Sequence, residues 1–396
     1  MDPSRVGGSS CERASGGRRN IVFAAMALIG ASAGIGSCGS VGEVAANGGM
    51  DAAIDSSIDA ALADERSVCG PPDGAVDAWT RVLGALNAGS AVWGSGECDV
   101  WIASGLGATT PGELAHWDGF SLSKVAQPWP ASRSLFGLSA HDAWAVGGAR
   151  IEHWDGQSWS ELMPDAGFLP VTGGWGTPVQ AWFTGSGLPR DHSDGRCNSG
   201  LLAAWDGQMW TEFPIVRSCG QAMWGTSQAN VWAVGWARSN LTPPKATCDH
   251  WDGQKWHLAG SGDPGTASFD QHAPFVAVHG SSSTNAWAVG IADSQIGGAV
   301  ARWDGQSWSL VPSPVYLGPC GQSGNGGGVC DLSGVWVAGP DEAWAVGGSG
   351  VFRWDGTTWA IHTKTIAPLR AVWGASPTSV WAVGDGAILH YAGTPN

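Results

Sequence analysis

The sequence contains little charge, and positive charge is the scarcer sign. Charged residues make up 13% of the 396 residues, and 19 Lys and Arg stand against 34 Asp and Glu, for a formal net charge of −15. A protein that holds nucleic acid neutralises phosphates with a basic stripe, and electrostatic docking on anionic lipid needs a polybasic segment. We therefore expect neither nucleic acid nor an anionic lipid surface as a partner.

Patterns that carry catalysis or hold a metal are missing as well. The sequence has no nucleophile elbow, no P-loop and no CxxC pair, and only five Glu follow residue 100. Oxygen and imidazole groups occur in two loops and could in principle hold a divalent cation, but they have no recognised spacing: Asp191, His192, Asp194, Asp270 and His272. We expect a non-enzymatic protein with no cofactor and no metal.

The first 37 residues have the pattern of a lipoprotein signal peptide. Arg13, Arg18 and Arg19 precede the apolar run 21–36, and sixteen residues are too few for a membrane-spanning helix, which needs about 20. Residues 35–38, IGSC, resemble the bacterial lipobox, which implies that Cys38 is acylated and becomes the mature N-terminus. An ordinary signal peptide cut nearby is the alternative. By resemblance to lipoprotein sorting rules, Gly39 favours the outer membrane as the location, with the protein facing either the periplasm or the outside. Arg18 and Arg19 faintly resemble a twin-arginine signal, so the choice between Sec and twin-arginine export stays open.

Residues 38–75 differ in composition from the longer C-terminal part of the chain. They are rich in Ala, Gly and Asp, and residues 39–75 hold seven acidic residues against one Arg. Such a segment cannot bury enough apolar surface to fold alone. We expect a flexible acidic tether between the lipid and a folded domain at 76–396.

The residues that the sequence has in abundance are Gly, at 62, and Trp, at 26. Most of the Trp belong to a repeat with seven copies. One aromatic marks each copy: Trp101, Trp144, Trp182, Trp232, Trp287, Trp344 and Trp381. A second anchor lies seven or eight residues earlier: Trp93, Phe136, Trp175, Trp224, His279, Trp336 and Trp373. Six copies continue into WDG and a further apolar residue five positions later.

Each copy therefore has four short runs of strand length, rich in β-branched and aromatic residues. Asp-Gly between the third and fourth runs predicts a two-residue type I′ hairpin, in which two residues have positive φ. Seven such units packed around an axis make an all-β, seven-bladed β-propeller of four-stranded blades. The seventh copy ends at Tyr391 without a fourth run, while Trp79 lies 14 residues before Trp93, the interval that separates Trp359 from Trp373. We predict that the N-terminal strand closes the last blade.

The phrases AVWGASPTSVWAVGDGAILHY and HWDGQSW resemble the repeats of Trp-rich exported bacterial β-propeller lipoproteins. They are also similar to tectonin-type repeats and, more loosely, to the Asp-box hairpins of sialidase-like propellers. The strict Asp-box has one residue between Asp and Gly, whereas here the two are adjacent. The resemblance covers 76–396 and implies the fold, while proteins of this kind serve as lectins, adhesion modules, scaffolds and occasionally enzymes.

The connections between runs differ in a way that indicates a binding face. The first-to-second and third-to-fourth turns are nearly constant in length, and they share one side of the disc, the short-turn face. The other connections vary and share the opposite side, the variable face, where propellers usually bind. Two Trp out of register could stack a ligand there, or could cover the rim of a neighbouring blade. The candidate ligand-binding set is Trp129, Trp236, Tyr316, Arg190, Arg196, Arg217 and Arg238.

Export favours disulfides among the cysteines. Cys320 and Cys330 bracket one insertion, Cys69 and Cys98 belong to the short-turn face, and Cys197 is the expected partner of Cys219, which leaves Cys248 as an odd thiol. Four histidines occupy one repeat position, directly before the third-run aromatic, and are assigned to structure: His116, His153, His250 and His390.

Three functions remain open on the sequence alone. The first is a monomeric cell-envelope lipoprotein whose propeller binds a cell-surface or extracellular glycan or protein through the variable face, touching the membrane only through its lipid anchor. The second is a glycoside hydrolase acting on acidic glycans at the same face, and the third is a scaffold without a small ligand. The sequence does not name the ligand.

Overall fold

The computed structural model describes residue 69 and most of residues 77–394. The chain divides into two units, Met1–Arg66 and the compact unit Ser67–Asn396. The leader, Cys38 and the tether up to residue 68 lie outside the described residues. So do these segments of the folded unit: 70–76, 85, 87, 106–111, 127–128, 149, 163–169, 187–199, 216–217, 238–244, 270–273, 292–297, 313–330, 349, 366 and 395–396.

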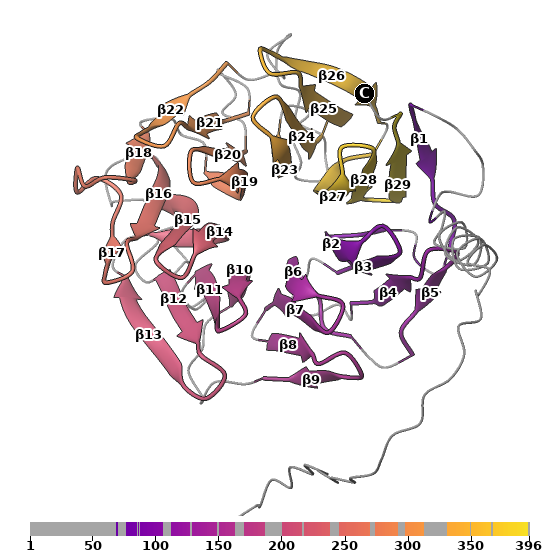
Figure 1. Cartoon of the computed structure of the whole chain (residues 1–396), viewed down its shortest axis with the longest axis horizontal. Coiled ribbons are helices and arrows are strands. Elements are labelled where there is room, and N and C mark those ends of the chain that lie inside the picture. The colour runs from indigo at the N-terminus through magenta and orange to yellow at the C-terminus, as the bar shows by residue number, and fades with distance from the viewer. Residues whose placement is uncertain are drawn as a thin grey trace, which may run out of the picture. The chain divides into compact units, whose positions relative to one another are not determined.

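The described residues of the compact unit form seven antiparallel sheets arranged around an axis, a seven-bladed β-propeller as the sequence predicts (Figure 1). Blade 1 comprises β2 (Ala91–Gly96), β3 (Asp99–Ala103), β4 (Leu114–Trp117) and β5 (Leu122–Lys124). Blade 2 comprises β6 (Ser134–Ser139), β7 (Asp142–Gly147), β8 (Arg150–Trp154) and β9 (Trp159–Glu161). Blade 3 comprises β10 (Val171–Thr177), β11 (Gln180–Ser186), β12 (Gly200–Trp205) and β13 (Trp210–Ile215).

The remaining blades keep the same order, from an inner first strand to an outer fourth strand. Blade 4 comprises β14 (Cys219–Ser227), β15 (Asn230–Ala237), β16 (Lys245–Trp251) and β17 (Trp256–His257), with an extra strand, β18 (Ala267–Phe269), on β16. Blade 5 comprises β19 (Phe275–Ser282), β20 (Asn285–Gly290), β21 (Val300–Trp303) and β22 (Trp308–Leu310). Blade 6 comprises β23 (Leu332–Gly339), β24 (Glu342–Gly347), β25 (Gly350–Trp354) and β26 (Trp359–Lys364). Blade 7 comprises β27 (Leu369–Ser376), β28 (Ser379–Gly384), β29 (Ala387–Ala392) and β1 (Ala78–Arg81).

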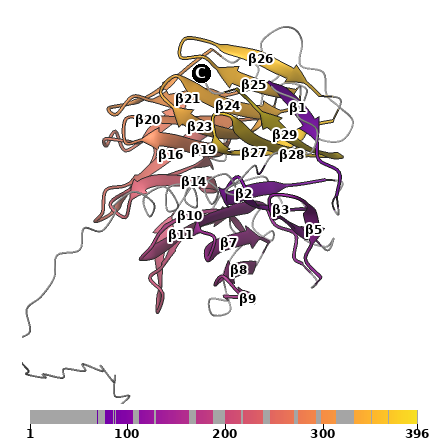
Figure 2. The same cartoon turned by 45° about the vertical axis from the view of Figure 1, so that its right-hand side comes forward.

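The closing strand is where the sequence predicts it. β1 pairs antiparallel with β29, and Trp79 lies opposite Tyr391 just as Trp359 lies opposite Trp354 in blade 6. Trp79 and Tyr391 both contact Trp344 of the neighbouring blade, with ring centroids 5.7 and 5.0 Å away. The last blade is therefore completed by a strand from the other end of the domain (Figure 2).

Tryptophans between blades form the core. In several pairs of adjacent blades, the second-strand Trp packs on the third- and fourth-strand Trp of the next blade, as Trp101 does on Trp154 and Trp159. Eight buried indole N–H groups have no hydrogen-bond acceptor among the described residues. Six of these groups belong to three T-shaped pairs, in which an N–H can face a π cloud: Trp101 with Trp159, Trp182 with Trp256, and Trp287 with Trp359.

The Asp-Gly hairpins differ from the predicted type I′ turn. In blade 5 the pair Trp303 and Trp308 encloses four residues, and Asp304 accepts the backbone N–H groups of Gln306 and Ser307 at 2.8 Å each. Within this turn Gly305 has a positive φ, at 96°, while the Asp does not. The Asp side chain thus replaces the second left-handed residue as the device that closes the turn.

Candidate functional site

The inner strands of the seven blades surround a central cavity of about 350 Å³. Each inner strand is at the end of its sheet order, so one edge of its backbone faces the channel. Residues two positions before each anchor are small: Ala91, Ser134, Gly173, Ala222, Ala277, Gly334 and Ala371. All of them except Gly173 line the cavity, and their small size keeps the channel open. An edge with free donors and acceptors can pair with an extended chain.

Residues three positions before each anchor form a ring where the inner strands begin, on the variable face. We call this ring the channel mouth: Ser90, Arg133, Thr172, Gln221, Val276, Ser333 and Arg370. Six of the seven are polar, and none is acidic. In a chain with a net charge of −15, the only charged members of the mouth are two cations.

The two arginines differ in how they are held. Arg370 donates from Nε to Oδ1 of Asp385 at 3.2 Å and from Nη2 to Oδ2 at 2.7 Å, so its guanidinium is fixed and partly neutralised. Arg133 is exposed and has no side-chain partner among the described residues. Blade 1 separates them, and its own mouth residue, Ser90, donates to the carbonyl of Ser132 in blade 2 at 2.6 Å. The free positive charge of the mouth is therefore that of Arg133.

The seven anchor side chains also line the cavity, and His279 is the one anchor that is neither Trp nor Phe. Its Nδ1 accepts the backbone N–H of Val337 in the next blade at 3.0 Å. Burial lowers the pKa of His279 to about 4, so the ring is neutral near pH 7 and its proton lies on Nε2. This side chain could donate one hydrogen bond, but it offers no charge to a ligand.

Two of the ligand-binding residues predicted from the sequence, Trp129 and Trp236, lie among the described residues. Trp129 is 4% exposed, contacts Trp159 and donates from Nε1 to Oγ of Ser132 at 3.0 Å. The burial of Trp129 agrees with the rim-covering alternative and leaves no indole face for a ligand. Trp236 lies within β15, not in a connection, and is half-buried. The rest of the set falls outside the described residues: Tyr316, Arg190, Arg196, Arg217 and Arg238.

Arg133 and Arg370 are absent from the predicted set because that set was drawn from residues that break the repeat. Both residues stand at a regular repeat position, where the other copies have Ser, Thr, Gln or Val. Their signal in the sequence is the presence of two cations at a position that is otherwise uncharged.

The described cysteines agree with part of the predicted pairing. Cys69 and Cys98 form a disulfide with 5.3 Å between their Cα atoms. Cys219 is also disulfide-bonded, while Cys197, its predicted partner, lies outside the described residues, as do Cys320 and Cys330. Cys248 is free and buried.

The repeat histidines have the structural role that their position indicates. His116, His153 and His250 stack on the second-strand Trp of their own blades, with centroids 4.2, 4.0 and 5.0 Å apart. His390 lies against Trp381 at 4.7 Å, and burial lowers its pKa to about 4. In blades 5 and 6, Arg302 and Arg353 occupy this position and cover Trp287 and Trp344 as cations.

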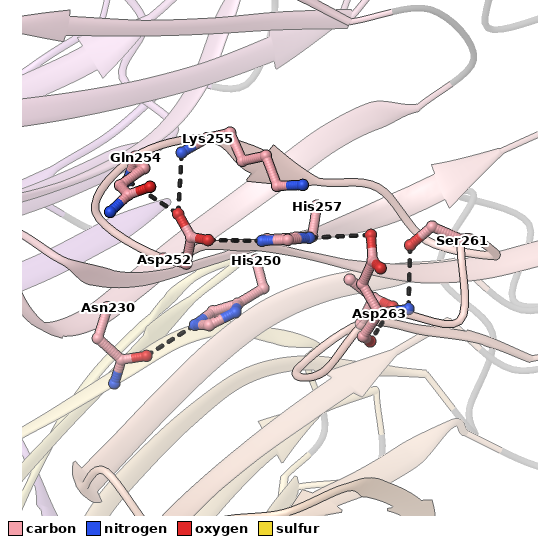
Figure 3. A network of polar contacts seen from close by, with 9 residues as sticks. Asn230, His250, Asp252, Gln254, Lys255, His257, Ser261 and Asp263 are labelled. Atoms are coloured by element: carbon pink, nitrogen blue, oxygen red, sulfur yellow. Dashed lines mark hydrogen bonds and ion pairs between the residues drawn. The ribbon is translucent and has the colours of Figure 1, made fainter.

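Blade 4 carries a second polar cluster at its outer strand (Figure 3). His257 lies between two carboxylates, with Nε2 2.7 Å from Asp252 and Nδ1 2.9 Å from Asp263. These contacts raise the pKa of His257, because both ring nitrogens donate only in the protonated form. Nearby, burial raises the pKa of Asp249 to about 6, although its Oδ1 accepts the N–H of Ala259. The cluster joins β17 to the loop before β18.

No group of three or more His, Cys, Asp or Glu among the described residues could hold a metal ion. Within the same part of the chain, no helix is long and apolar enough to cross a membrane. The polar cluster of blade 4 fastens the loop 258–266, because His257 of β17 contacts Asp263 and Asp249 of β16 accepts the N–H of Ala259.

The sequence matches no protein-family model and no curated protein. Solved structures show the same fold at low identity. The structure of YCF48 bound to a D1 peptide is 15% identical, with a TM-score of 0.53 over 82% of this chain and 100% of that one. The Neurospora crassa Pan2 WD40 domain is 12% identical, with a TM-score of 0.52 over 82% and 98%. The extracellular domain of BT4673 from B. thetaiotaomicron is 11% identical, with a TM-score of 0.51 over 79% of this chain and 39% of that chain.

Proposed function

We propose that this protein is a non-enzymatic, exported, lipid-anchored propeller that binds an acidic segment of a protein partner at the channel mouth. The observation that carries the proposal is the mouth itself, a polar ring with two arginines and no acidic member above a cavity of about 350 Å³. One structural neighbour is YCF48 bound to a D1 peptide, which is consistent with a peptide as the ligand.

The chemistry of the mouth favours a carboxylate. Arg133 is exposed and forms no ion pair among the described residues, so it can pair with a carboxylate without breaking an existing one. Arg370 keeps a fixed orientation through Asp385 and still has a donor free. The small residues below the mouth leave room for an extended chain along the inner strand edges.

A glycan is the second candidate ligand, because the hydroxyl group of Ser333 and the amide group of Gln221 can serve sugar hydroxyls equally well. An acidic glycan would use the same arginines. Catalysis is not part of the proposal, since hydrolysis of glycosides uses two facing carboxylic acids or, in sialidases, a Tyr nucleophile, and the mouth ring contains neither.

The test is fluorescence anisotropy with labelled decapeptides rich in Glu, compared with the same peptides carrying Gln in place of Glu. We expect binding of the Glu peptides only, weakened at least fivefold by Arg133→Gln and weakened further as salt rises. Arg150→Gln is the matched control, because Arg150 is an exposed arginine of β8 outside the mouth. Equal binding of both peptide sets, or equal losses for Arg133→Gln and Arg150→Gln, would refute the mouth as an acidic-segment site. A glycan array probed with the same variants tests the second ligand.

A further inference from the structure

Large apolar side chains are exposed at the turns of blades 1–3 on the short-turn face. Phe120 is 80% exposed, Met209 65%, Val179 60% and Leu138 36%. Phe120, Met209 and Val179 lie in the β4–β5, β12–β13 and β10–β11 turns. Leu138 lies in β6, one residue before the strand ends at the β6–β7 turn. We call these four residues the apolar tips.

At the positions of Phe120 and Met209, the Asp-Gly turns of blades 2, 4 and 5 carry polar residues. At the position of Phe120, blades 2, 4 and 5 have Gln157, Gln254 and Gln306. At the position of Met209, blades 2, 4 and 5 have Ser158, Lys255 and Ser307. Blades 1, 2 and 3 are neighbours in the ring, so the apolar tips occupy one sector of the short-turn face (Figure 1).

The chain that follows the proposed lipid anchor, Cys38, is attached at Cys69 to the short-turn face of the propeller, in the same sector as the apolar tips. Cys69 is bonded to Cys98, which lies in the turn between β2 and β3. A Cβ placed on Gly119 would lie 3.1 Å from Sγ of Cys69, so the disulfide touches the turn that carries Phe120. The chain between Cys38 and Cys69 has 31 peptide steps, which span at most about 110 Å when fully extended.

We infer that the apolar tips rest on the bilayer that holds the lipid anchor, so that the short-turn face of blades 1–3 faces the membrane and the channel mouth faces away. This inference rests on the proposed function, since it needs Cys38 to be acylated. Insertion of a few exposed side chains is weak alone, but the tether confines the propeller close to the surface and raises its effective concentration there. The orientation presents the mouth to partners in the surrounding compartment.

Charge on this face selects the kind of lipid. Each Asp-Gly turn places an aspartate there, and backbone N–H groups hold the pKa of Asp118, Asp155 and Asp206 below its ordinary value, so they stay ionised. Anionic headgroups would be repelled. The occupant is therefore a zwitterionic bilayer surface.

The experiment compares hydrogen exchange in the acylated mature chain, reconstituted in vesicles of phosphatidylcholine and phosphatidylethanolamine, with the unacylated chain that begins at Gly39, free in solution. Exchange at 119–121, 138–141, 178–180 and 207–209 is expected to slow at least fivefold on vesicles. The corresponding turns of blades 5 and 6, at 304–307 and 355–358, serve as internal controls and should change little. Anionic phosphatidylglycerol at about one third of the lipid should reduce the protection.

Two variants complete the design. Phe120→Gln combined with Met209→Ser installs the residues that other blades carry at these positions, and should abolish the protection while leaving the fold intact. Ile291→Ser removes an apolar side chain that is 41% exposed just after β20, on the variable face, and should keep it. Equal slowing in all seven blades, slowing of the variable face, or no slowing would overturn the inference.

Three further measurements complete the test. The first asks whether a second copy covers the tips, and the other two separate this inference from the proposals it rests on. Protection of the apolar tips that grows with protein concentration in the absence of vesicles would show that a second copy covers them, and would also overturn the inference. The mass of the N-terminal peptide reports acylation of Cys38 independently. Binding of the Glu peptides by the Phe120→Gln, Met209→Ser chain reports the channel mouth, and is expected to be unchanged whether or not the tips touch lipid.

Discussion

The packing between neighbouring inner strands predicts that substitutions at His279 and Val337 have coupled effects on the free energy of unfolding. In six blades the residue after the anchor is Gly. In blades 1, 2, 4, 5 and 7 a Cβ placed on that Gly would lie 2.5–2.9 Å from the anchor ring of the preceding blade. Real Cβ atoms do not approach that closely, so an indole at the anchor requires Gly in the next blade. Blade 6 has Val337 at this position, and the anchor that precedes it is the smaller His279.

We therefore expect the two positions to be coupled. His279→Trp drives an indole against Val337 and removes the hydrogen bond from Val337 N–H to Nδ1, at a cost of about 2–4 kcal/mol in the free energy of unfolding. Val337→Gly removes a side chain that is 3% exposed and should cost about 2–3 kcal/mol. The double variant recreates the Trp-over-Gly packing of the other blades, and should be more stable than the sum of the single losses by about 2 kcal/mol.

Urea unfolding of the oxidised chain, followed by circular dichroism, measures these free energies if all four proteins share one m-value. Gly225→Val is the control in which a Val is placed against an indole. Trp175 lies 2.9 Å from a Cβ placed on Gly225, and because the anchor stays a Trp in this variant, the substitution should be destabilising. Losses in the double variant that equal the sum of the single losses within about 0.5 kcal/mol would refute the coupling.

The closure and the polar cluster lead to three more expected outcomes. Trp79→Ala should lower the free energy of unfolding by about 3 kcal/mol, measured by urea unfolding, and a loss below about 1 kcal/mol would contradict a closing role for β1. The Cys69–Cys98 disulfide closes a span of 29 residues, so replacing both by Ala should cost about 3–4 kcal/mol, which a lower melting temperature under non-reducing conditions checks. His257→Gln should destabilise the protein most below pH 6.5, since a raised histidine pKa stabilises the fold at low pH. The destabilisation should fade as the pH rises through the raised pKa of His257. Melting temperatures of the two proteins that differ by a constant amount from pH 5 to 9 would contradict this.

The fold could be predicted from the sequence because the intervals between repeated residues show which segments occupy equivalent strands, and equivalent strands pair in the same way in every blade. Trp79 precedes Trp93 by the same 14 residues that separate Trp359 from Trp373, and this equality alone identified the closing strand. The type I′ turn was wrong because Asp-Gly has two ways to close a hairpin. Propensity cannot tell a left-handed Asp from an Asp whose carboxylate accepts the next backbone N–H groups.

The site was harder to predict because departures from the repeat are a poor guide to it. Trp129 departs from the repeat and is buried against Trp159, since a connecting segment that folds back onto a blade can bury its own Trp. Arg133 keeps to the repeat and stands exposed at the channel mouth. In a propeller every blade contributes the same positions to the channel, so a ligand site there is composed of regular positions filled by unusual residues. Comparing the seven copies position by position, at the residues three before each anchor, finds the mouth, and the acidic-peptide experiment with Arg133→Gln decides whether it is a site.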